Sequence, residues 1–464
     1  MSGHRSQVDM DTIRRFDRPG PRYTSYPTAV EFHEGVGEGT YREKLAEANQ
    51  QGPEAPLSLY AHLPFCEHRC LFCGCHVVIT PHMPVAEKYL EYVKREIDRV
   101  AGYLPDRRRV VQMHWGGGTP TYFSPQQLTD LLDRYRRHFD LVEGAELAIE
   151  VDPRVTSREH LDTLVDLGFN RLSMGVQDLT PEVQEAITRG QTWEQTAELM
   201  TYARQVGFNE GINLDLIYGL PKQKLETFST NLDQILDLRP DRVAVYSFAY
   251  VPWIKGHQKK LDKSTLPSAE NKLRLYLMAM ERFLDAGYEP IGMDHFALPD
   301  DELAVAAREH RLHRNFMGYT VMPASDMIAF GVSGIGEVQG AFFQNEKKLS
   351  TYYAALDDGR LPVQRGYVLD EDDRVRQYVI HEIMCNFRVS KEDVERRFDV
   401  DFDAYFRDSL DNLQEVREEG FVEMDDQGLR VTEEGRLFVR NVCMAFDKYL
   451  QAKKAEKPVF SRTV

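Results

Sequence analysis

The chain lacks the long apolar runs that membrane proteins need. No stretch approaches the ~18 consecutive apolar residues of a membrane-spanning helix, and the opening residues, MSGHRSQVDMDTIRRF, lack the apolar segment of a secretory signal. We therefore expect a cytoplasmic protein with no membrane partner. The 464 residues, 42% of them hydrophobic, suffice for one large core and at least one further domain.

Positive charge is also scarce. The chain has 57 Lys and Arg residues against 74 Asp and Glu, which gives a net charge of −17. Binding to nucleic acid requires a basic surface, so we expect no nucleic-acid partner. An anionic substrate would need a local basic pocket. The sequence carries no coiled-coil signal, and we expect a monomer.

Cysteine is sparse but strongly clustered. Of six cysteines, four lie within ten residues in the segment FCEHRCLFCGCH, residues 65–76. In a reducing compartment such clusters bind metals or act in redox chemistry more often than they form disulfides. The other two, Cys385 and Cys443, lie in apolar helical patterns, and we predict that they are packing residues.

Short runs typical of β-strands recur along the chain, each followed by a helical pattern. They cover residues 57–63, 110–115, 146–151, 171–176, 212–218 and 242–248. Strands that alternate with helices form parallel sheets. We predict an α/β fold built on a partial (β/α)6 barrel.

The unusual residues follow these strands directly. They are the cysteine segment, GGGTP (116–120), VDP (151–153), QD (177–178), GLP (219–221) and AYVPW (249–253). Because the carboxyl ends of parallel strands converge on one face, we expect one site built from these six loops. Gly and Pro in such loops also have a purely structural explanation.

The last hundred residues differ in pattern. Helices are predicted at 372–386, 390–397 and 402–418, a hairpin at 425–428, and a final helix from Thr432, which is the order of a winged helix. The excess of acidic residues argues against DNA binding, so we expect a structural or docking role. The predicted domains are an N-terminal extension over the active site (1–50), the barrel and its extension (51–365), and a helical, winged-helix-like domain (366–464).

Three of the clustered cysteines are candidate metal ligands. Cys66, Cys70 and Cys73 have C-x3-C-x2-C spacing. Structural zinc sites use two pairs of ligands separated by a longer gap, and no second pair follows. A ferredoxin cluster uses four thiolates. Three thiolates leave one coordination position open, as in catalytic metal sites.

This cysteine spacing, directly after the first strand of an α/β barrel, resembles that of the radical S-adenosylmethionine (SAM) enzymes. The resemblance implies that Cys66, Cys70 and Cys73 hold a [4Fe–4S] cluster and that SAM binds the fourth iron. In the superfamily the reduced cluster cleaves SAM to methionine and a 5′-deoxyadenosyl radical. The GGGTP segment fits the glycine-rich stretch that approaches the SAM amino group.

Longer strings narrow the resemblance to one family. From about residue 12 to 450 the chain resembles the oxygen-independent coproporphyrinogen III oxidases. The strings that carry this are GPRYTSYPT (20–28), LYAHLPFCEHRCLFCGCH (59–76), HWGGGTPTY (114–122), IEVDPR (149–154), RLSMGVQD (171–178), DLIYGLPKQ (215–223), GMDHFALPDDELAVA (292–306), LHRNFMGYT (312–320) and CNFRV (385–389).

The resemblance implies the conversion of coproporphyrinogen III to protoporphyrinogen IX in anaerobic haem biosynthesis. Two propionate side chains would become vinyl groups, with an electron donor for the cluster and an electron acceptor as further partners. The alternative is a haem chaperone or another non-decarboxylating relative. Those relatives lack the CGC ending with Cys75 and the GPRYTSYPT segment, which are both present here. A plain electron-transfer protein would leave the barrel and the glycine-rich loop unexplained.

The resemblance also implies site residues. At the cluster-bound SAM these are Tyr60, Gly117, Glu150, Ala249 and Ile335, and at a second SAM position Phe72, Gly118, Thr119, Gln177, Arg189 and Asp215. Cys75, Glu150 and Ile335 are the expected catalytic residues. The simpler alternative is that Phe72 packs in the core and that the acidic residues are helix caps or turn formers.

Four arginines are candidates for a propionate pocket. Arg22 lies in GPRYTSYPT, and Arg308, Arg311 and Arg314 follow one another at helical spacing. For the last three, a solvated helix face is the alternative. Met317 departs from the glutamine-like residue expected after Asn315 and Phe316, which removes the basis for a hydrogen-bonding role there.

Overall fold

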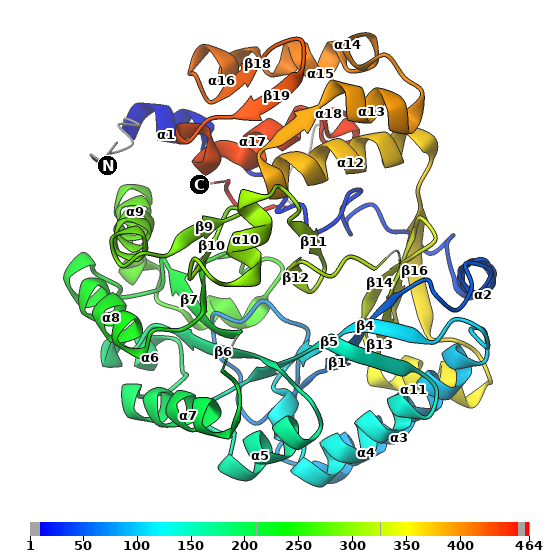
Figure 1. The fold of residues 1–464 in the computed structure, drawn as a ribbon. Helices are drawn as coiled ribbons and strands as arrows, with labels where there is room; N and C mark the ends of the chain where they lie inside the picture. The colour runs from blue at the N-terminus through cyan, green and yellow to red at the C-terminus, as the bar shows by residue number, and fades with distance from the viewer. Residues whose placement is uncertain (1–9, 210, 325, 453–459, 464) are drawn as a thin grey trace.

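A computed structural model of the chain describes residues 10–209, 211–324, 326–452 and 460–463. Among these residues a twelve-stranded mixed sheet curves through the molecule, with helices along its outer side (Figure 1). Residues 1–9, 453–459 and 464 belong to the predicted N-terminal extension and C-terminal domain but lie outside the described residues. The predicted absence of a signal segment concerns residues 1–16, of which the first nine lie outside the described residues.

The six predicted strands form the centre of this sheet. They are β1 (Leu57–Leu63), β4 (Arg109–Gly117), β5 (Asp140–Val151), β6 (Arg171–Gln177), β7 (Ile212–Tyr218) and β8 (Arg242–Ser247). They are neighbours in this order, and each pair is parallel. The predicted α/β fold with an open, partial barrel is confirmed.

Further strands extend the sheet at both edges. β13 (Asp326–Phe330) pairs with β1 in parallel, and antiparallel strands continue from there. The antiparallel strands are β14 (Ile335–Val338), β15 (Ala341–Asn345) and β16 (Val363–Val368) on one edge, and β10 (His295–Ala297) and β9 (Glu289–Ile291) on the other. The irregular region between 290 and 365 therefore completes the sheet.

Helices that follow the parallel strands cover the outer side of the sheet (Figure 1). They are α3 (Met83–Ala101), α4 (Pro125–Arg136), α5 (Arg158–Asp166), α6 (Pro181–Ala186), α7 (Trp193–Val206), α8 (Leu225–Leu238) and α9 (Ala269–Asp285). Local sequence sets their ends. Ser124 caps α4 by accepting the backbone N–H of Gln127, and Gly207 ends α7 at a φ of 130°.

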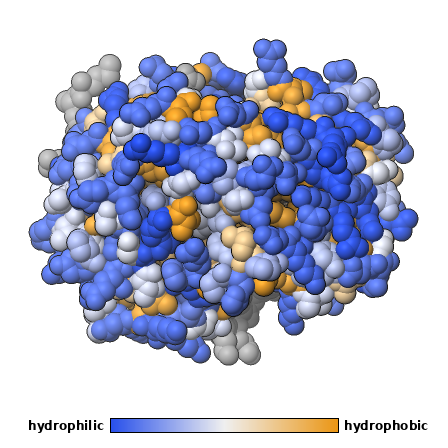
Figure 2. All heavy atoms as spheres, turned by 90° about the horizontal axis from the view of Figure 1, so that it is seen from below, coloured by the Kyte–Doolittle hydropathy of each residue, from blue (hydrophilic) through white to orange (hydrophobic). Residues whose placement is uncertain are grey.

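The surface is mixed in polarity. On the face shown in Figure 2, hydrophobic residues lie scattered among hydrophilic ones. Among the described residues, no helix combines the length and the apolar composition needed to span a membrane.

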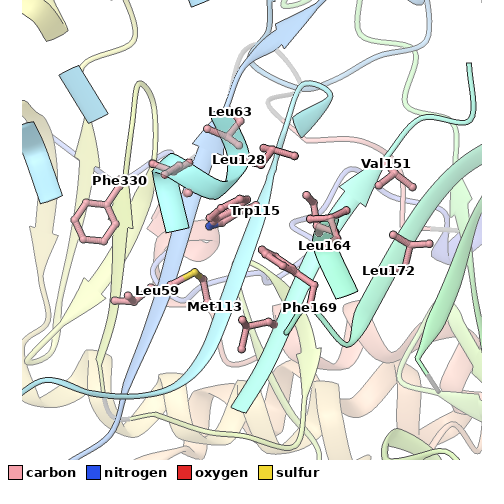
Figure 3. Packing of buried hydrophobic residues seen from close by; sticks show 14 of the residues in the cluster. Leu59, Leu63, Met113, Trp115, Leu128, Val151, Leu164, Phe169, Leu172 and Phe330 are labelled. Atoms are coloured by element: carbon pink, nitrogen blue, oxygen red, sulfur yellow. The ribbon is translucent and has the colours of Figure 1, made fainter. Parts of the chain in front are cut away.

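Apolar side chains fill the space between sheet and helices. Figure 3 shows Met113, Trp115 and Phe169 packed behind the strands, with the rings of Trp115 and Phe169 4.9 Å apart. Trp115 is completely buried and stands immediately before the glycine-rich segment. The core therefore holds the strands rigid up to the point where the site loops begin.

The N-terminal segment contributes to the C-terminal core. The ring of Phe16, at the end of α1 (Met10–Phe16), lies 5.3 Å from that of Phe421 and 5.4 Å from that of Phe438. α2 (Glu38–Asn49) instead packs near β14 and β16. The first fifty residues therefore tie the barrel and the C-terminal part together.

The C-terminal part has the predicted order of helices and hairpin. It comprises α12 (Glu371–Asn386), β17 (Arg388–Ser390), α13 (Lys391–Phe398), α14 (Phe402–Tyr405), α15 (Arg407–Asn412), α16 (Gln414–Glu418), β18 (Val422–Met424), β19 (Gly428–Val431), η4 (Glu434–Phe438), α17 (Val439–Met444) and α18 (Lys448–Ala452). The predicted helix over 402–418 is broken into three, at Phe406, whose φ of −100° and ψ of 18° leave helical geometry, and at Leu413. Cys385 and Cys443 are buried, as predicted.

Several short elements lie in the loops around the site. They are β2 (Phe65–Cys66), β3 (Val78–Ile79), η1 (Pro120–Tyr122), η2 (Gly256–Lys260), η3 (Lys263–Thr265), α10 (Glu302–Arg308), β11 (His313–Asn315), β12 (Gly318–Thr320) and α11 (Leu349–Asp357).

Candidate active site

The cysteine loop leaves the carboxyl end of β1 and is held at both sides by backbone contacts. β2 and β3 pair in parallel at its two ends. Within it, the Cys73 N–H donates to the Cys70 carbonyl at 3.2 Å, and the Leu71 N–H donates to the Ile187 carbonyl at 2.9 Å. The His257 ring, on η2, donates from Nε2 to the Cys73 carbonyl at 2.9 Å. The loop is thus positioned by α6 and η2, far away in sequence.

Each candidate ligand has a different polar partner. Cys66 Sγ lies 3.4 Å from the Thr119 hydroxyl. Cys70 Sγ accepts from the guanidinium groups of Arg154 at 3.7 Å and Arg189 at 3.8 Å. Two guanidinium groups therefore lie beside this sulfur, and Asp152 forms ion pairs with both of them.

The pKa values of the thiols differ with their surroundings. Burial raises the pKa of Cys66 to about 11. The thiol of Cys75 is a hydrogen-bond partner of Cys73 and lowers the pKa of Cys73 to about 6. Cys75 itself is exposed at the end of the loop, where Lys255 Nζ donates to its carbonyl at 3.4 Å.

The donor set fits an iron–sulfur cluster. Among the described residues, no three Cys, His, Asp or Glu side chains are placed to share a single metal ion. The three thiols of a cluster each bind a separate iron and need not converge on one point. Cys66, Cys70 and Cys73 would hold the cluster, and SAM would complete it.

The three glycines after β4 make room for their neighbours. A Cβ on Gly116 would lie 2.8 Å from the Glu150 carboxylate, and one on Gly118 would lie 2.5 Å from the Pro64 carbonyl carbon. Gly117 has a φ of +117°, and a Cβ there would lie 2.6 Å from the His62 ring. The triplet thus brings the cysteine loop and Glu150 together.

Glu150 lies at the end of β5, with polar groups aimed at its carboxylate. The Gly117 N–H donates to Oε2 at 2.9 Å, and His114 Nε2 lies 3.4 Å from Oε1. Burial raises its pKa, but the hydrogen bonds from His114 and Gly117 outweigh it, so the pKa lies below the usual value. Glu150 is therefore an anion that can accept further N–H or O–H donors.

Tyr60 lies beside this group in a chain of hydrogen bonds. Its hydroxyl lies 3.0 Å from His62 Nδ1, and His62 Nε2 lies 2.9 Å from the His76 carbonyl. The Tyr60 ring stacks on His114 with centroids 6.0 Å apart. The chain connects the predicted residues Tyr60 and Glu150 to the end of the cysteine loop.

A second group gathers around Cys70. Arg189 Nη2 donates to the Gly175 carbonyl at 2.6 Å and forms an ion pair with Asp152 at 3.5 Å. Its guanidinium lies 6.0 Å from the Phe72 ring centre. Gln177, with a φ of 70°, lies against the same Gly175. The structure therefore brings together Phe72, Gln177 and Arg189, three of the residues predicted for a second SAM position.

Asp215 instead lines a cavity inside the barrel. The cavity, of about 140 Å³, is also lined by His114, Glu150 and Met317. Burial raises the pKa of Asp215 to about 6, against a hydrogen bond from Asn213. Glu150, whose pKa is lowered, and Asp215, whose pKa is raised, thus line the same cavity.

Met317 enters this cavity from the tip of the β11–β12 hairpin. Its N–H donates to the Asn315 side chain at 2.8 Å, which shapes the turn. The side chain at 317 therefore faces the same space as Glu150, although a thioether provides only a weak acceptor there.

Ala249 and Ile335, both predicted at the cluster-bound SAM, lie in different surroundings. Gln258 Nε2 donates to the Ala249 carbonyl at 3.1 Å and to the Phe72 carbonyl at 3.3 Å, which ties Ala249 to the cysteine loop. Ile335, at the start of β14, packs with Phe32 and Phe316 in a separate apolar cluster.

The predicted helical row of arginines is wrong. α10 ends at Arg308, which pairs with Glu289 at 2.7 Å, and His310 then takes a φ of 54°. Arg311 pairs with Glu309 at the surface. Of Arg308, Arg311 and Arg314, only Arg314, on β11, points into the molecule.

Arg22 and Arg314 remain as candidates for anion binding. Arg314 Nη1 donates to the Arg22 carbonyl at 2.9 Å, and Arg22 donates to the Ser247 carbonyl at 3.0 Å. Arg314 also borders a cavity of about 590 Å³ between the N-terminal segment, the hairpin and α12. A cavity of this volume is in the range of cofactor and ligand sites.

Comparisons with known proteins agree with this geometry. Family models match at residues 60–235 (Radical SAM superfamily) and 369–438 (HemN C-terminal domain). The oxygen-independent coproporphyrinogen III oxidase of Escherichia coli K12 is 43% identical to this chain, and the alignment covers 100% of both chains. The enzyme of the same name from Synechocystis sp. is 42% identical, over 99% of this chain and 98% of the relative. The chain belongs to the family of oxygen-independent coproporphyrinogen III oxidases.

A solved structure from this oxidase family has the same fold. The E. coli structure, whose description reads "Coproporphyrinogen III oxidase (HemN) from Escherichia coli is a Radical SAM enzyme", has a TM-score of 0.90, 42% identity, and covers 96% of this chain and 99% of its own. The predicted family, fold and enzyme class are confirmed. The individual site residues and domain boundaries stay predictions.

Several polar residues that complete the oxidase site were missed from the sequence. They are His62, His114, Asp152, Arg154 and His257, which contact the predicted residues. Four of them stand inside the strings LYAHLP, HWGGG and VDPR, so their position beside predicted residues was an available signal. His257 had none, because only the fold brings η2 to the cysteine loop.

Proposed function

We propose that this chain converts coproporphyrinogen III to protoporphyrinogen IX without O2. For each of two propionates, –CH2–CH2–COO⁻ would lose a hydrogen atom, an electron and CO2 to leave –CH=CH2. The observation that carries the proposal is the C-x3-C-x2-C spacing of Cys66, Cys70 and Cys73 in the loop after β1, in a chain similar over its full length to oxidases of that name.

The cluster and SAM, when bound, supply the radical that removes the hydrogen atom. The protein's own groups bind, orient and exclude water. Cys66, Cys70 and Cys73 hold the cluster, with Arg154 and Arg189 stabilising negative charge on Cys70. Glu150, fixed by the Gly117 N–H, is placed to accept polar hydrogens of SAM.

The finer features belong to the same proposal. Phe72, Gln177 and Arg189 would contribute to a second SAM position beside Cys70. Cys75, exposed at the end of the loop, would act on the substrate rather than on iron. An external electron donor and an acceptor, a monomeric state and a cytoplasmic location complete the proposal.

The decisive experiment uses anaerobically reconstituted protein with SAM, a reductant and coproporphyrinogen III. We expect release of CO2 together with 5′-deoxyadenosine and protoporphyrinogen IX. Omission of SAM or of reductant should abolish all three products.

Deoxyadenosine without CO2 would exclude the proposed function. Tight binding of intact haem under the same conditions would favour a haem-carrying role instead.

A further inference from the structure

Three cations from three separate segments lie around the exposed end of the cysteine loop. Lys255 precedes η2, Lys347 lies between β15 and α11, and Arg365 lies on β16. All three are half-buried. None of them was singled out by the sequence pattern.

The contacts of Lys255 and Lys347 place these two cations next to Cys75 and His76, and Arg365 lies close enough to Lys347 to repel its charge. Lys255 Nζ donates to the Cys75 carbonyl at 3.4 Å. The backbone of Lys347 is a hydrogen-bond partner of the His76 ring. Arg365 donates from Nε to Gln344 Oε1 at 2.7 Å, and Gln344 is the partner of Ile335 across the β14–β15 pair.

Among the residues that the structure describes, no carboxylate forms an ion pair with Lys255, Lys347 or Arg365. Burial lowers the pKa of Lys347, and repulsion from Arg365 and Lys255 lowers it further. A chain with 74 acidic residues thus leaves three neighbouring cations without a carboxylate at the site. An incoming anion would relieve that repulsion.

The surface beside them is apolar. The Arg365 guanidinium lies 5.9 Å from the Phe32 ring centre and donates to the Phe32 carbonyl at 3.4 Å. Phe32 packs in one cluster with Phe316 and Ile335. An apolar surface with cations at its edge matches a macrocycle that carries carboxylates on its rim.

We propose that Lys255, Lys347 and Arg365 form a carboxylate-binding site that holds a propionate of the tetrapyrrole beside Cys75. The inference rests on the proposed function and adds the residues that recognise the substrate. Phe316 and Ile335, which pack on the buried Phe32 ring and are themselves half-buried, form the apolar surface against which the macrocycle lies. The three cations are positioning residues, because they fix the macrocycle relative to the cluster loop.

The test measures the binding of coproporphyrin III, the stable oxidised form of the substrate, to the reconstituted enzyme. Lys347→Met and Arg365→Met should each weaken binding by about tenfold or more, as expected for a lost charged hydrogen bond. Lys348→Met removes the same charge from the exposed neighbouring position and should leave binding unchanged. The tetramethyl ester of the same porphyrin, which has no carboxylates, should bind all variants alike.

Kinetics give a second readout. The variants should raise KM for coproporphyrinogen III, while the cluster spectrum and SAM cleavage without substrate stay as in the wild type. The dependence of porphyrin binding on salt should also become weaker, because fewer charges contribute. If one variant fails to fold, Lys255→Met tests the same site from another segment.

Two results would overturn the inference. One is unchanged coproporphyrin III affinity in folded variants of all three residues. The other is weakened SAM binding with normal porphyrin binding, which would assign the cations to the SAM carboxylate. Both results require a wild-type enzyme that releases CO2. If the wild type releases no CO2, that result counts against the proposed function alone.

Discussion

The two ends of the active site are built in different ways. The cysteine loop supplies all three candidate iron ligands from residues 66–73, whereas the proposed carboxylate site takes Lys255, Lys347 and Arg365 from segments that meet only in the fold. Ligands of one cluster must be rigidly spaced, and a short loop provides this directly. A broad anionic substrate can instead be recognised by charges spread around its rim.

The largest effect is expected at the loop. Cys70→Ser removes the one thiol that two guanidinium groups contact, so the cluster should not assemble and all turnover should stop. Absorption spectra and iron content after anaerobic reconstitution measure this. A variant that retains the spectrum of a [4Fe–4S] cluster would show that the ligands are misassigned. Cys385→Ser, at a buried packing position, is the control for loss of a thiol.

Cys75→Ser should impair decarboxylation but leave the cluster and SAM cleavage intact. Because Cys75 is exposed and lies beside the proposed carboxylate site, we expect decarboxylation to fall by at least about a hundredfold, on the scale of a lost proton-transfer group. The cluster spectrum and SAM cleavage should persist, as measured by 5′-deoxyadenosine formation. Loss of the cluster in this variant would instead make Cys75 part of the metal site.

Glu150→Gln should give a smaller, selective loss. The amide oxygen can still accept the Gly117 N–H, but the negative charge is gone, so SAM affinity should fall by about tenfold. Equilibrium binding of SAM and of coproporphyrin III to the same preparation measures this selectivity. Equal weakening of both ligands would contradict separate ends of the site.

The smallest effect on activity is expected for a substitution of Glu96, a core residue whose hydrogen-bond partners come from distant segments. Its carboxyl group accepts from the Gly331 N–H, the Asn345 amide and the Tyr352 hydroxyl. Burial raises its pKa to about 7. The folded state therefore binds this proton more tightly than the unfolded state, and wild-type stability should fall as pH rises from about 4.5 to 7.

Glu96→Gln removes this titration. Relative to the variant, the wild type should lose up to about 3 kcal/mol of unfolding free energy across that pH range, while activity per folded molecule stays the same. Urea unfolding at several pH values measures the difference. A pH-independent difference between the two proteins would mean that the pKa of Glu96 is the same in the folded and unfolded states.

The fold was largely accessible from sequence where local patterns are strong. The six parallel strands were predicted within a few residues, since each is a buried run followed by a helix. The edge strands β9, β10 and β14 were not, because they are short and held by pairing with distant neighbours. The predicted row of arginines was wrong for a related reason. The helical spacing of Arg308, Arg311 and Arg314 continues along the sequence, but the helix itself ends at Arg308.

The sequence by itself determined the cysteine spacing, the glycine triplet and the order of strands, because these depend on neighbours along the chain. Only the tertiary structure decided which charges meet. Arg154 and Arg189 reach Cys70 across the barrel, and Arg314 rather than Arg308 turns inward. Electrostatic partners act through space over several ångströms, so their identity depends on how separate segments pack.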